Sequence, residues 1–283
     1  FLFNILRIRK KEENLFSVII VVLLIVKFSR LSEFGYDYIS QFLLFVIFHK
    51  VLFKNNIFAE FKKSSYIFLL SIIIKPVCIL FAPIYLFFLK NKKNFIFYNF
   101  KKFSKLFIFL GLILILSSSF FRTGCLFYPS LFTCFDNKKI HWSEKEFLSE
   151  YSDEVRNWAK SFHNQKKSKY KVIEDSKKYS SNFNWVKYWI DLHFFYKIFE
   201  YLIIFITIYL ISYILFKKEA LNFEQRKKFF NNQALLLLIS FLCVSAWFIL
   251  IPQFRFGFAS IAIFTYLLVN LMLNKIIIIE QKK

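Results

Sequence analysis

Six charged residues beside long apolar stretches could bind an anionic, lipid-linked substrate. They are Arg30, Glu33, Asp37, Lys75, Arg122 and Arg255. Cations can bind a phosphate or pyrophosphate, because they neutralise the charge that develops on such a leaving group. Carboxylates can accept hydrogen bonds from a polar substrate. We therefore expect a substrate-binding pocket in which Lys75, Arg122 and Arg255 contact the anionic group. Glu33 and Asp37 are expected to contact a polar part of the substrate.

Each of these residues also has a structural interpretation. Arg30, Glu33 and Asp37 are three and four positions apart, so a helix would place them on one face. There Arg30 could orient the two carboxylates for a polar substrate or a cation, or the three could form an ion-pair cluster at the membrane edge. Lys75 could extend its head group to the membrane surface or pair with a carboxylate. The sequence leaves both interpretations open.

Motifs of well-known chemistries are absent from the sequence. It contains no phosphate-binding Walker loop, nucleophile elbow, zinc-protease helix or dinucleotide fingerprint. The cysteines have no recognised zinc-site spacing with His141 or His163. We therefore assign no catalytic residue, no metal ligand and no cofactor, with a divalent cation left as an alternative.

The composition indicates a membrane protein. The chain has 283 residues, of which 57% are hydrophobic, and its mean hydropathy is +0.47. The apolar residues form unbroken blocks, which is typical of membrane-spanning helices. The net charge of +22 lies largely in short lysine runs between these blocks, as expected for cytoplasmic loops. We predict an all-α, polytopic transmembrane protein whose partner is the lipid bilayer and not a nucleic acid.

The predicted spans alternate so that the short basic loops lie on one side of the membrane. They cover residues 15–28, 38–53, 66–89, 106–121, 198–216, 234–251 and 257–273. The block 66–89 fits this scheme only as a re-entrant helical hairpin, because Lys75-Pro76 lies at its middle and the most basic loop follows it. Proline breaks the helix there, and broken helices are tolerated where they line a protein cavity.

A long extracytoplasmic loop divides the predicted chain into three parts. Transmembrane helices with the re-entrant hairpin cover residues 1–121, the loop covers 122–197, and C-terminal transmembrane helices cover 198–283. Disulfides persist on the outer side of the membrane. We expect Cys125 and Cys134 to form one, with two free thiols as the alternative.

The loop is predicted to be partly helical. Residues 143–163 have a helical spacing of aromatic side chains, and Ser143 with Glu146 matches a capping box. An aromatic belt at the membrane surface is expected near the end of the loop. Its members would be Trp185, Tyr188, Trp189 and Phe195.

Several stretches resemble an uncharacterised family of bacterial multi-spanning membrane proteins. The resemblance rests on residues 122–129, 133–135, 141–142, 155–160 and 182–191 of the loop, and it extends to 29–37 and 255–257. That family is distantly similar to the integral-membrane GT-C glycosyltransferases. The broken block around Lys75-Pro76 is similar to a lysine-bearing hairpin of those enzymes. Their catalytic base is an acidic residue of the first outer loop.

The start of the chain limits what this resemblance implies. The residues from Phe1 to Arg7 look like the end of a preceding segment, so we expect an N-terminally truncated fragment that lacks the base. The resemblance then implies part of a GT-C-like glycosyltransferase of the bacterial inner membrane. It would use a polyprenyl-phosphate-linked sugar in cell-surface polysaccharide synthesis. Lys75, Arg122 and Arg255 would then bind the phosphate or pyrophosphate, and Glu33 and Asp37 would contact sugar hydroxyls. The alternatives are a non-enzymatic transporter or scaffold of a polysaccharide assembly, or a polysaccharide polymerase or ligase.

Overall fold

The computed structural model describes residues 11–28, 37–53, 57–85, 102–128, 130–136, 138, 140–143, 145–215 and 223–280. Within these ranges the regular elements are all helical, which confirms the predicted all-α class. Three of the described helices are long and apolar enough to cross a membrane: Val186–Ile214, Gln233–Leu250 and Phe254–Met272. Shorter apolar helices cover Leu15–Val26, Lys63–Ile74 and Phe109–Thr123.

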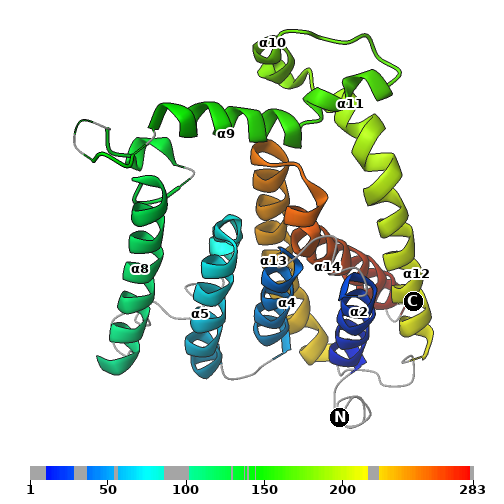
Figure 1. Cartoon of the computed structure of the whole chain (residues 1–283). Coiled ribbons are helices and arrows are strands. Elements are labelled where there is room, and N and C mark those ends of the chain that lie inside the picture. Colours follow the sequence, from blue (N-terminus) through cyan, green and yellow to red (C-terminus); the bar gives the residue numbers. More distant parts are fainter. Residues whose placement is uncertain are drawn as a thin grey trace. The chain divides into compact units, whose positions relative to one another are not determined.

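The chain folds into two compact units (Figure 1). Unit 1 comprises residues 1–96, 197–249 and 254–283, and unit 2 comprises residues 97–196 and 250–253. The expected division after residues 121 and 197 concerns the membrane topology and stays a prediction. The helix before the loop belongs to the same unit as the loop itself.

Unit 1 is built from long apolar helices. Its elements are α2 (Lys11–Phe28), α4 (Asp37–Phe53), α5 (Ile57–Ile74), the 3₁₀-helix η1 (Pro76–Ile84), α12 (Glu200–Leu215), α13 (Phe223–Leu250) and α14 (Phe254–Glu280). Apart from charged residues that lie mostly near the starts of α2, α5 and α13, their sequences are apolar on every side and nearly free of glycine. A helix that is apolar all round is suited to a protein interior or a membrane rather than to water. The helical conformation satisfies the backbone N–H and C=O groups within the segment itself.

Phe258 is fully buried at the centre of an aromatic cluster that joins three of these helices. Its ring lies 5.5–6.0 Å from the rings of Tyr38, Phe42 and Phe45 of α4. The ring of Tyr201 of α12 lies 5.1 Å away. Buried aromatic rings contribute large contact areas and prefer the tilted and edge-on geometries seen here. The cluster therefore fixes the start of α14 beside the start of α4.

The chain turns back on itself at Lys75-Pro76. The α-helix α5 ends just before this pair, because proline cannot continue the backbone hydrogen bonding, and η1 begins at Pro76. Beyond η1, the ring of Tyr85 lies 5.6 Å from that of Phe61 and 5.2 Å from that of Phe68, both in α5. The second arm thus runs back along the first, and the turn lies at the residues that the sequence indicated.

Unit 2 contains one long helix and several short ones. Its elements are α8 (Lys102–Thr123), the 3₁₀-helix η2 (Leu131–Thr133), α9 (Lys145–Ala159), the 3₁₀-helix η3 (Phe162–Lys167), α10 (Ser176–Ser180), the 3₁₀-helix η4 (Ser181–Phe183) and α11 (Val186–Trp189). A π-helix, η5 (Ile190–Phe199), then leads into α12. The predicted loop helix is confirmed as α9, although it ends earlier than expected.

The core of unit 2 is aromatic. Trp185, Tyr188 and Trp189 are buried, and the Tyr179 ring lies 5.2 Å from that of Tyr188. The indole N–H of Trp189 donates to the carbonyl of Pro252 at 2.6 Å. An aromatic belt at the membrane surface was expected from Trp185, Tyr188, Trp189 and Phe195. That expectation is wrong for Trp185, Tyr188 and Trp189, because their side chains are buried inside the protein.

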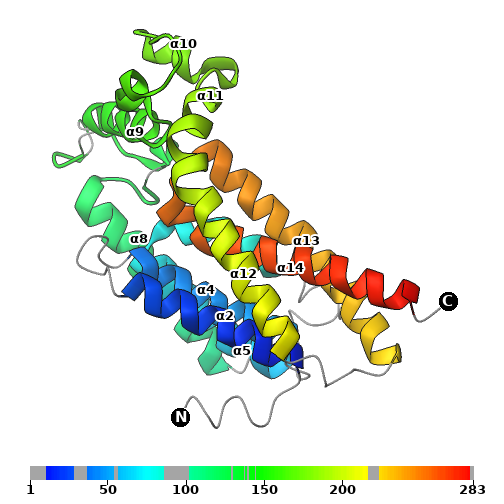
Figure 2. The ribbon, with the colours of Figure 1, turned by 90° about the vertical axis from the view of Figure 1, so that its right-hand side faces the viewer.

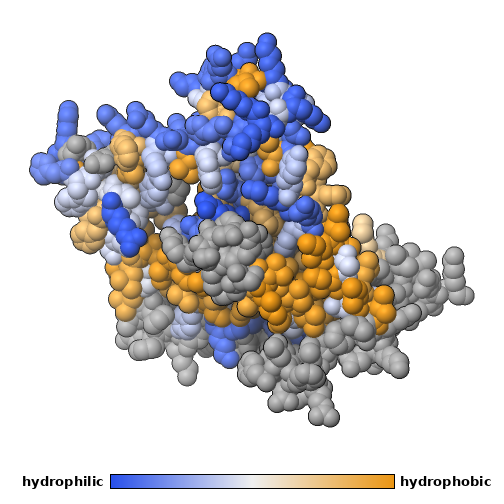
Figure 3. All heavy atoms as spheres, turned by 45° about the vertical axis from the view of Figure 1, so that its right-hand side comes forward, coloured by the Kyte–Doolittle hydropathy of each residue, from blue (hydrophilic) through white to orange (hydrophobic). Residues whose placement is uncertain are grey.

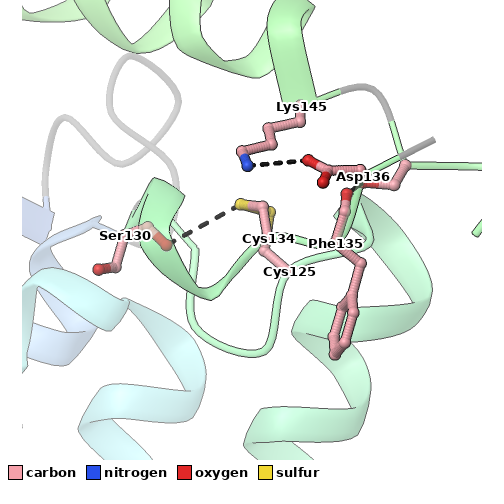
Figure 4. A network of polar contacts seen from close by, with 7 residues as sticks. Cys125, Ser130, Cys134, Phe135, Asp136 and Lys145 are labelled. Carbon is pink, nitrogen blue, oxygen red and sulfur yellow. Dashed lines mark hydrogen bonds and ion pairs between the residues drawn. A yellow bond between two sulfur atoms is a disulfide. The ribbon is translucent and has the colours of Figure 1, made fainter. Parts of the chain in front are cut away.

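A disulfide between Cys125 and Cys134 closes the segment after α8 (Figure 4). Gly124 precedes it with a φ of +68°, a conformation that side chains rarely adopt. Ser143 packs directly on this glycine, and its hydroxyl donates to the carbonyl of Phe135. These contacts fasten the start of α9 to the end of α8.

Hydrophobic side chains cover the surface of the long helices, whereas hydrophilic ones dominate around α9 and α10 (Figure 3). In unit 1 the exposed apolar residues include Ile25, Ile73 and Ile214, and in unit 2 they include Leu114 and Phe121. Contiguous apolar surface of this kind is rare on soluble monomers. It indicates a lipid environment for the helices.

Candidate anion-binding site

Asp37, Lys75 and Arg255 form the candidate site, which we call the triad. Asp37 is the first residue of α4, Lys75 separates α5 from η1, and Arg255 lies in the first turn of α14. The Nζ atom of Lys75 lies 2.5 Å from Oδ1 of Asp37, and Nε of Arg255 lies 3.5 Å from Oδ2. The Asp37 side chain is only 7% exposed, against 23% for Lys75 and 34% for Arg255. A buried carboxylate thus lies against two cations that remain partly exposed.

The ring of Phe256 lies close to both cations. Its centroid is 5.1 Å from Nζ of Lys75 and 4.8 Å from Cζ of Arg255. The negative face of an aromatic ring attracts cations at such distances. The formal charges of the triad sum to one positive charge. Two cations held together by one carboxylate and one ring make an arrangement to which an anion can bind.

The helix break positions Lys75. Its backbone is extended, with φ −145° and ψ 105°, because a residue before proline is excluded from the helical region. Its N–H donates to the carbonyl of Ser71 at 2.9 Å, and its own carbonyl accepts from the N–H of Cys78 at 3.0 Å. Both backbone polar groups are therefore satisfied, although the residue belongs to neither helix. The turn fixes where the lysine side chain begins.

A close contact between α13 and α14 positions Arg255. Ring atoms of Trp247 occupy the place where a Cβ atom of Gly257 would lie. Only glycine allows α13 and α14 to approach so closely there. Arg255 lies two residues before Gly257, so this contact also fixes the position of Arg255 near Asp37. The Arg255-Phe256-Gly257 motif thus supplies a cation, a ring and a close contact.

Gln41 is a neighbour of the triad that the sequence analysis did not single out. It is fully buried one turn after Asp37. Its Oε1 accepts a hydrogen bond from the N–H of Ala259 at 3.2 Å, and its Nε2 lies 3.9 Å from Sγ of Cys78. It therefore links α4 to both elements that carry the cations. The sequence contained a signal for Gln41, because it lies one helical turn after Asp37 in a largely apolar helix.

The structure brings together only part of the predicted set. Arg122 lies exposed in the last turn of α8, which belongs to unit 2. Arg30 and Glu33 lie outside the described residues. Among the residues that are described, no group of three or more His, Cys, Asp and Glu could hold a metal ion.

Comparisons with known proteins place the chain in a family. No curated protein and no solved structure matches it. A family model described as a domain of unknown function (DUF8201) matches residues 1–262. That region includes the triad and the whole of unit 2. The chain therefore belongs to the DUF8201 family.

Proposed function

We propose that this protein is a multi-pass protein of the bacterial inner membrane and part of a GT-C-like glycosyltransferase. Its donor would be a polyprenyl-phosphate-linked sugar for cell-surface polysaccharide synthesis. The observation that carries the proposal is the convergence of Lys75 and Arg255 on the buried carboxylate of Asp37. Cations gathered at the ends of apolar helices suit the phosphate of a lipid-linked molecule, whose chain remains in the bilayer.

The proposed topology puts the triad at the outer side of the membrane. The positive-inside rule assigns the short basic loops to the cytoplasm and leaves residues 122–197 outside. The hairpin of α5 and η1 is then re-entrant, and its turn at Lys75-Pro76 reaches the outer membrane edge. The start of α14, which carries Arg255, lies at the same level because it pairs with the same carboxylate.

The two cations have a defined task in sugar transfer from such a donor. As the bond between the sugar and the phosphate breaks, negative charge accumulates on the departing phosphate. Lys75 offers an ammonium group with three donors, and Arg255 offers a planar fork that matches phosphate oxygens. Asp37 would hold both cations in place before the donor binds. Once Lys75 and Arg255 pair with the phosphate, the carboxylate of Asp37 can accept a hydrogen bond from a sugar hydroxyl.

Binding of a polyprenyl phosphate tests the proposal directly. The purified protein in nanodiscs would be titrated with decaprenyl phosphate and with decaprenol, which has the same chain without the phosphate. We expect clear binding of the phosphate and much weaker binding of the alcohol, because only the former can pair with the triad. Equal affinities would show that the lipid chain alone is recognised, and the proposal would fail.

Charge-removing variants locate the binding. Lys75→Gln and Arg255→Gln should each weaken binding of decaprenyl phosphate at least tenfold, since charged hydrogen bonds contribute about 1.5–3 kcal/mol. Lys145→Gln is the matched control, because this lysine pairs with Asp136 of unit 2 at 2.9 Å, outside the triad. Its affinity should match that of the natural protein.

A non-enzymatic role in a polysaccharide assembly is the second candidate. One observation favours it: both oxygens of the only carboxylate in the triad contact a cation. A general base must be available to take a proton, and a carboxylate engaged in this way is poorly suited to that role. Lipid phosphate binding without any sugar transfer to polysaccharide acceptors would favour a transporter or scaffold over a glycosyltransferase, polymerase or ligase.

A further inference from the structure

The helix α9 has three distinct faces. At about 100° per residue, Ser152, Val155 and Ala159 share one face, and Ser152 and Ala159 are buried against unit 2. Glu146 and Asp153 lie on the opposite face, where both are exposed. The third face lies between these two and is aromatic. It does not belong to the candidate site, which lies in unit 1.

The aromatic face is exposed. It consists of Phe147, Tyr151 and Trp158, which are 59%, 49% and 43% exposed. The rings of Phe147 and Tyr151 stack on each other at a centroid distance of 6.2 Å. Three large aromatic side chains in line on one helix face are a costly surface to leave in water. Something is therefore expected to cover them.

The start of α9 is fixed at the end of α8. The indole N–H of Trp142 donates to the carbonyl of Phe120 at 3.3 Å, and the two rings pack at 5.7 Å. Ser143 packs on Gly124, the residue after α8. From this junction α9 runs across the axis of α8 rather than along it (Figures 1 and 2). If α8 crosses the membrane, α9 lies roughly in the plane of its surface.

One residue of the aromatic face, Tyr151, lies near the segment that follows α8. The N–H of Tyr128 donates to Oγ of Ser119 at 3.0 Å, which holds Tyr128 beside α8 one turn before its end. Tyr151 lies close enough to Tyr128 to influence it: burial raises the pKa of Tyr128, and Tyr151 raises it further. The flank that carries Tyr151 is therefore on the α8 side of α9.

The surface that this flank faces is apolar. α8 has 22 residues, roughly 33 Å at 1.5 Å per residue, and its apolar part covers Phe109–Thr123. Its exposed large hydrophobic side chains are Phe109, Leu110, Leu112, Ile113, Leu114, Leu116 and Phe121, and Ser118 and Arg122 are exposed beside them. Unit 2 thus exposes an apolar surface on α8 and an aromatic face on α9.

We propose that α9 is an interfacial helix whose aromatic face lies in the outer surface of the membrane. The inference rests on the topology of the proposed function, in which α8 crosses the bilayer. Amphipathic helices insert aromatic and aliphatic side chains at the boundary between head groups and acyl chains, and tyrosine and tryptophan favour this depth. α9 contains four acidic and two basic residues, so its contact does not depend on anionic lipids.

Spin-label accessibility of single cysteines tests this inference. Phe147→Cys, Tyr151→Cys and Trp158→Cys would be labelled in phosphatidylcholine nanodiscs, with Glu150→Cys and Asp153→Cys as matched positions on the polar side. The label is specific because Cys125 and Cys134 are bridged and Cys78 and Cys243 are buried. Leu114→Cys on α8 reports independently whether that helix is in the bilayer.

We expect labels on the aromatic face to collide more with oxygen and less with a water-soluble nickel complex than the polar-side labels. If the nickel complex reached all labels on α9 while the label at Leu114→Cys collided mainly with oxygen, the proposed topology would remain but the inference would be overturned. Immobilised aromatic-face labels that neither reagent reaches would identify a protein partner instead, and would also overturn it. A water-accessible label at position 114 would remove the topology and the inference together.

Discussion

The Nζ atom of Lys75 lies 2.5 Å from Oδ1 of Asp37, so the break between α5 and η1 is joined to the first turn of α4. This contact makes the proline-induced break a part of the site. Pro76 ends α5 at Ile74, and the extended backbone at Lys75 leaves this lysine outside both helical elements. The same carboxylate receives Arg255 from α14, which a glycine contact holds in place.

Asp37→Asn should destabilise the folded protein, because Lys75 and Arg255 would each lose an ion pair with a buried carboxylate. We expect a loss of about 1–3 kcal/mol, below the cost of breaking a fully buried pair, since Lys75 and Arg255 retain some exposure to solvent. Thermal unfolding in detergent measures it. Asp153→Asn is the control, because Asp153 is exposed and pairs only loosely with Arg156 at 3.7 Å. Equal effects of the two substitutions would contradict the structural importance of the triad.

Gly257→Ala should lower stability because the added methyl group would collide with the Trp247 ring. Overpacking of this kind typically costs about 1–3 kcal/mol. The combination with Trp247→Leu should cost less than the sum of the two single changes, because the smaller side chain makes room for the methyl group. Additive losses in the double-mutant cycle would show that the contact does not limit how closely α13 and α14 approach.

Much of unit 1 could be predicted from sequence, for a physical reason. A membrane-spanning segment must be apolar along its whole length and must satisfy its own backbone, so composition alone identifies it. The break at Lys75-Pro76 was equally visible, since proline excludes a helix there and a charge is costly inside a bilayer.

Pairing between distant segments could not be predicted in the same way. Asp37 was expected in one pocket with Lys75 and Arg255, but the spacing in the sequence suggested a direct partnership only with Arg30 and Glu33. Its ion pairs with Lys75 and Arg255 depend instead on how α4, α5 and α14 pack. The buried Gln41 was missed for the same reason, since its partners lie on other helices.

The aromatic residues of the loop show a second limit of sequence patterns. Trp185 and Trp189 were expected at the membrane surface, and both are buried in unit 2. Helical spacing revealed the aromatic residues of α9 but not which face would be covered. A tryptophan can satisfy its N–H inside a protein or at a wet surface, and only the fold decides between them.

The disulfide between Cys125 and Cys134 should stabilise unit 2. It closes a loop with a sequence separation of 9, for which the chain-entropy model gives about 2–3 kcal/mol. We expect reduction, or the double change Cys125→Ser and Cys134→Ser, to speed hydrogen exchange of the Leu126 and Phe135 amides. These amides donate to Thr133 and Gly124 across the loop. If mass spectrometry without reducing agent found both cysteines as free thiols, the disulfide would be absent and this prediction would fail.

The buried phenol of Tyr179 should make the stability of unit 2 fall at alkaline pH. Burial raises the pKa of Tyr179 and the neighbouring Tyr188 raises it further, while the hydroxyl donates to the carbonyl of Lys160 at 2.7 Å. A raised pKa means that the folded state keeps its proton when the unfolded chain has lost it. The stabilisation is therefore complete below the unfolded pKa of about 10 and is lost as the pH rises above it.

A comparison with Tyr179→Phe isolates this effect. Lys160 acts in the opposite sense, because burial and then Arg156 lower its pKa, but it is present in both proteins and cancels in the difference. We expect the difference in unfolding free energy between the natural protein and Tyr179→Phe to be constant up to about pH 10 and to shrink above it. Phe162→Leu, which changes a ring 5.3 Å from that of Tyr179 without a titrating group, should give a difference that does not vary with pH. If the difference in unfolding free energy between the natural protein and Tyr179→Phe also stayed constant above about pH 10, burial in unit 2 would not raise the pKa of the Tyr179 phenol.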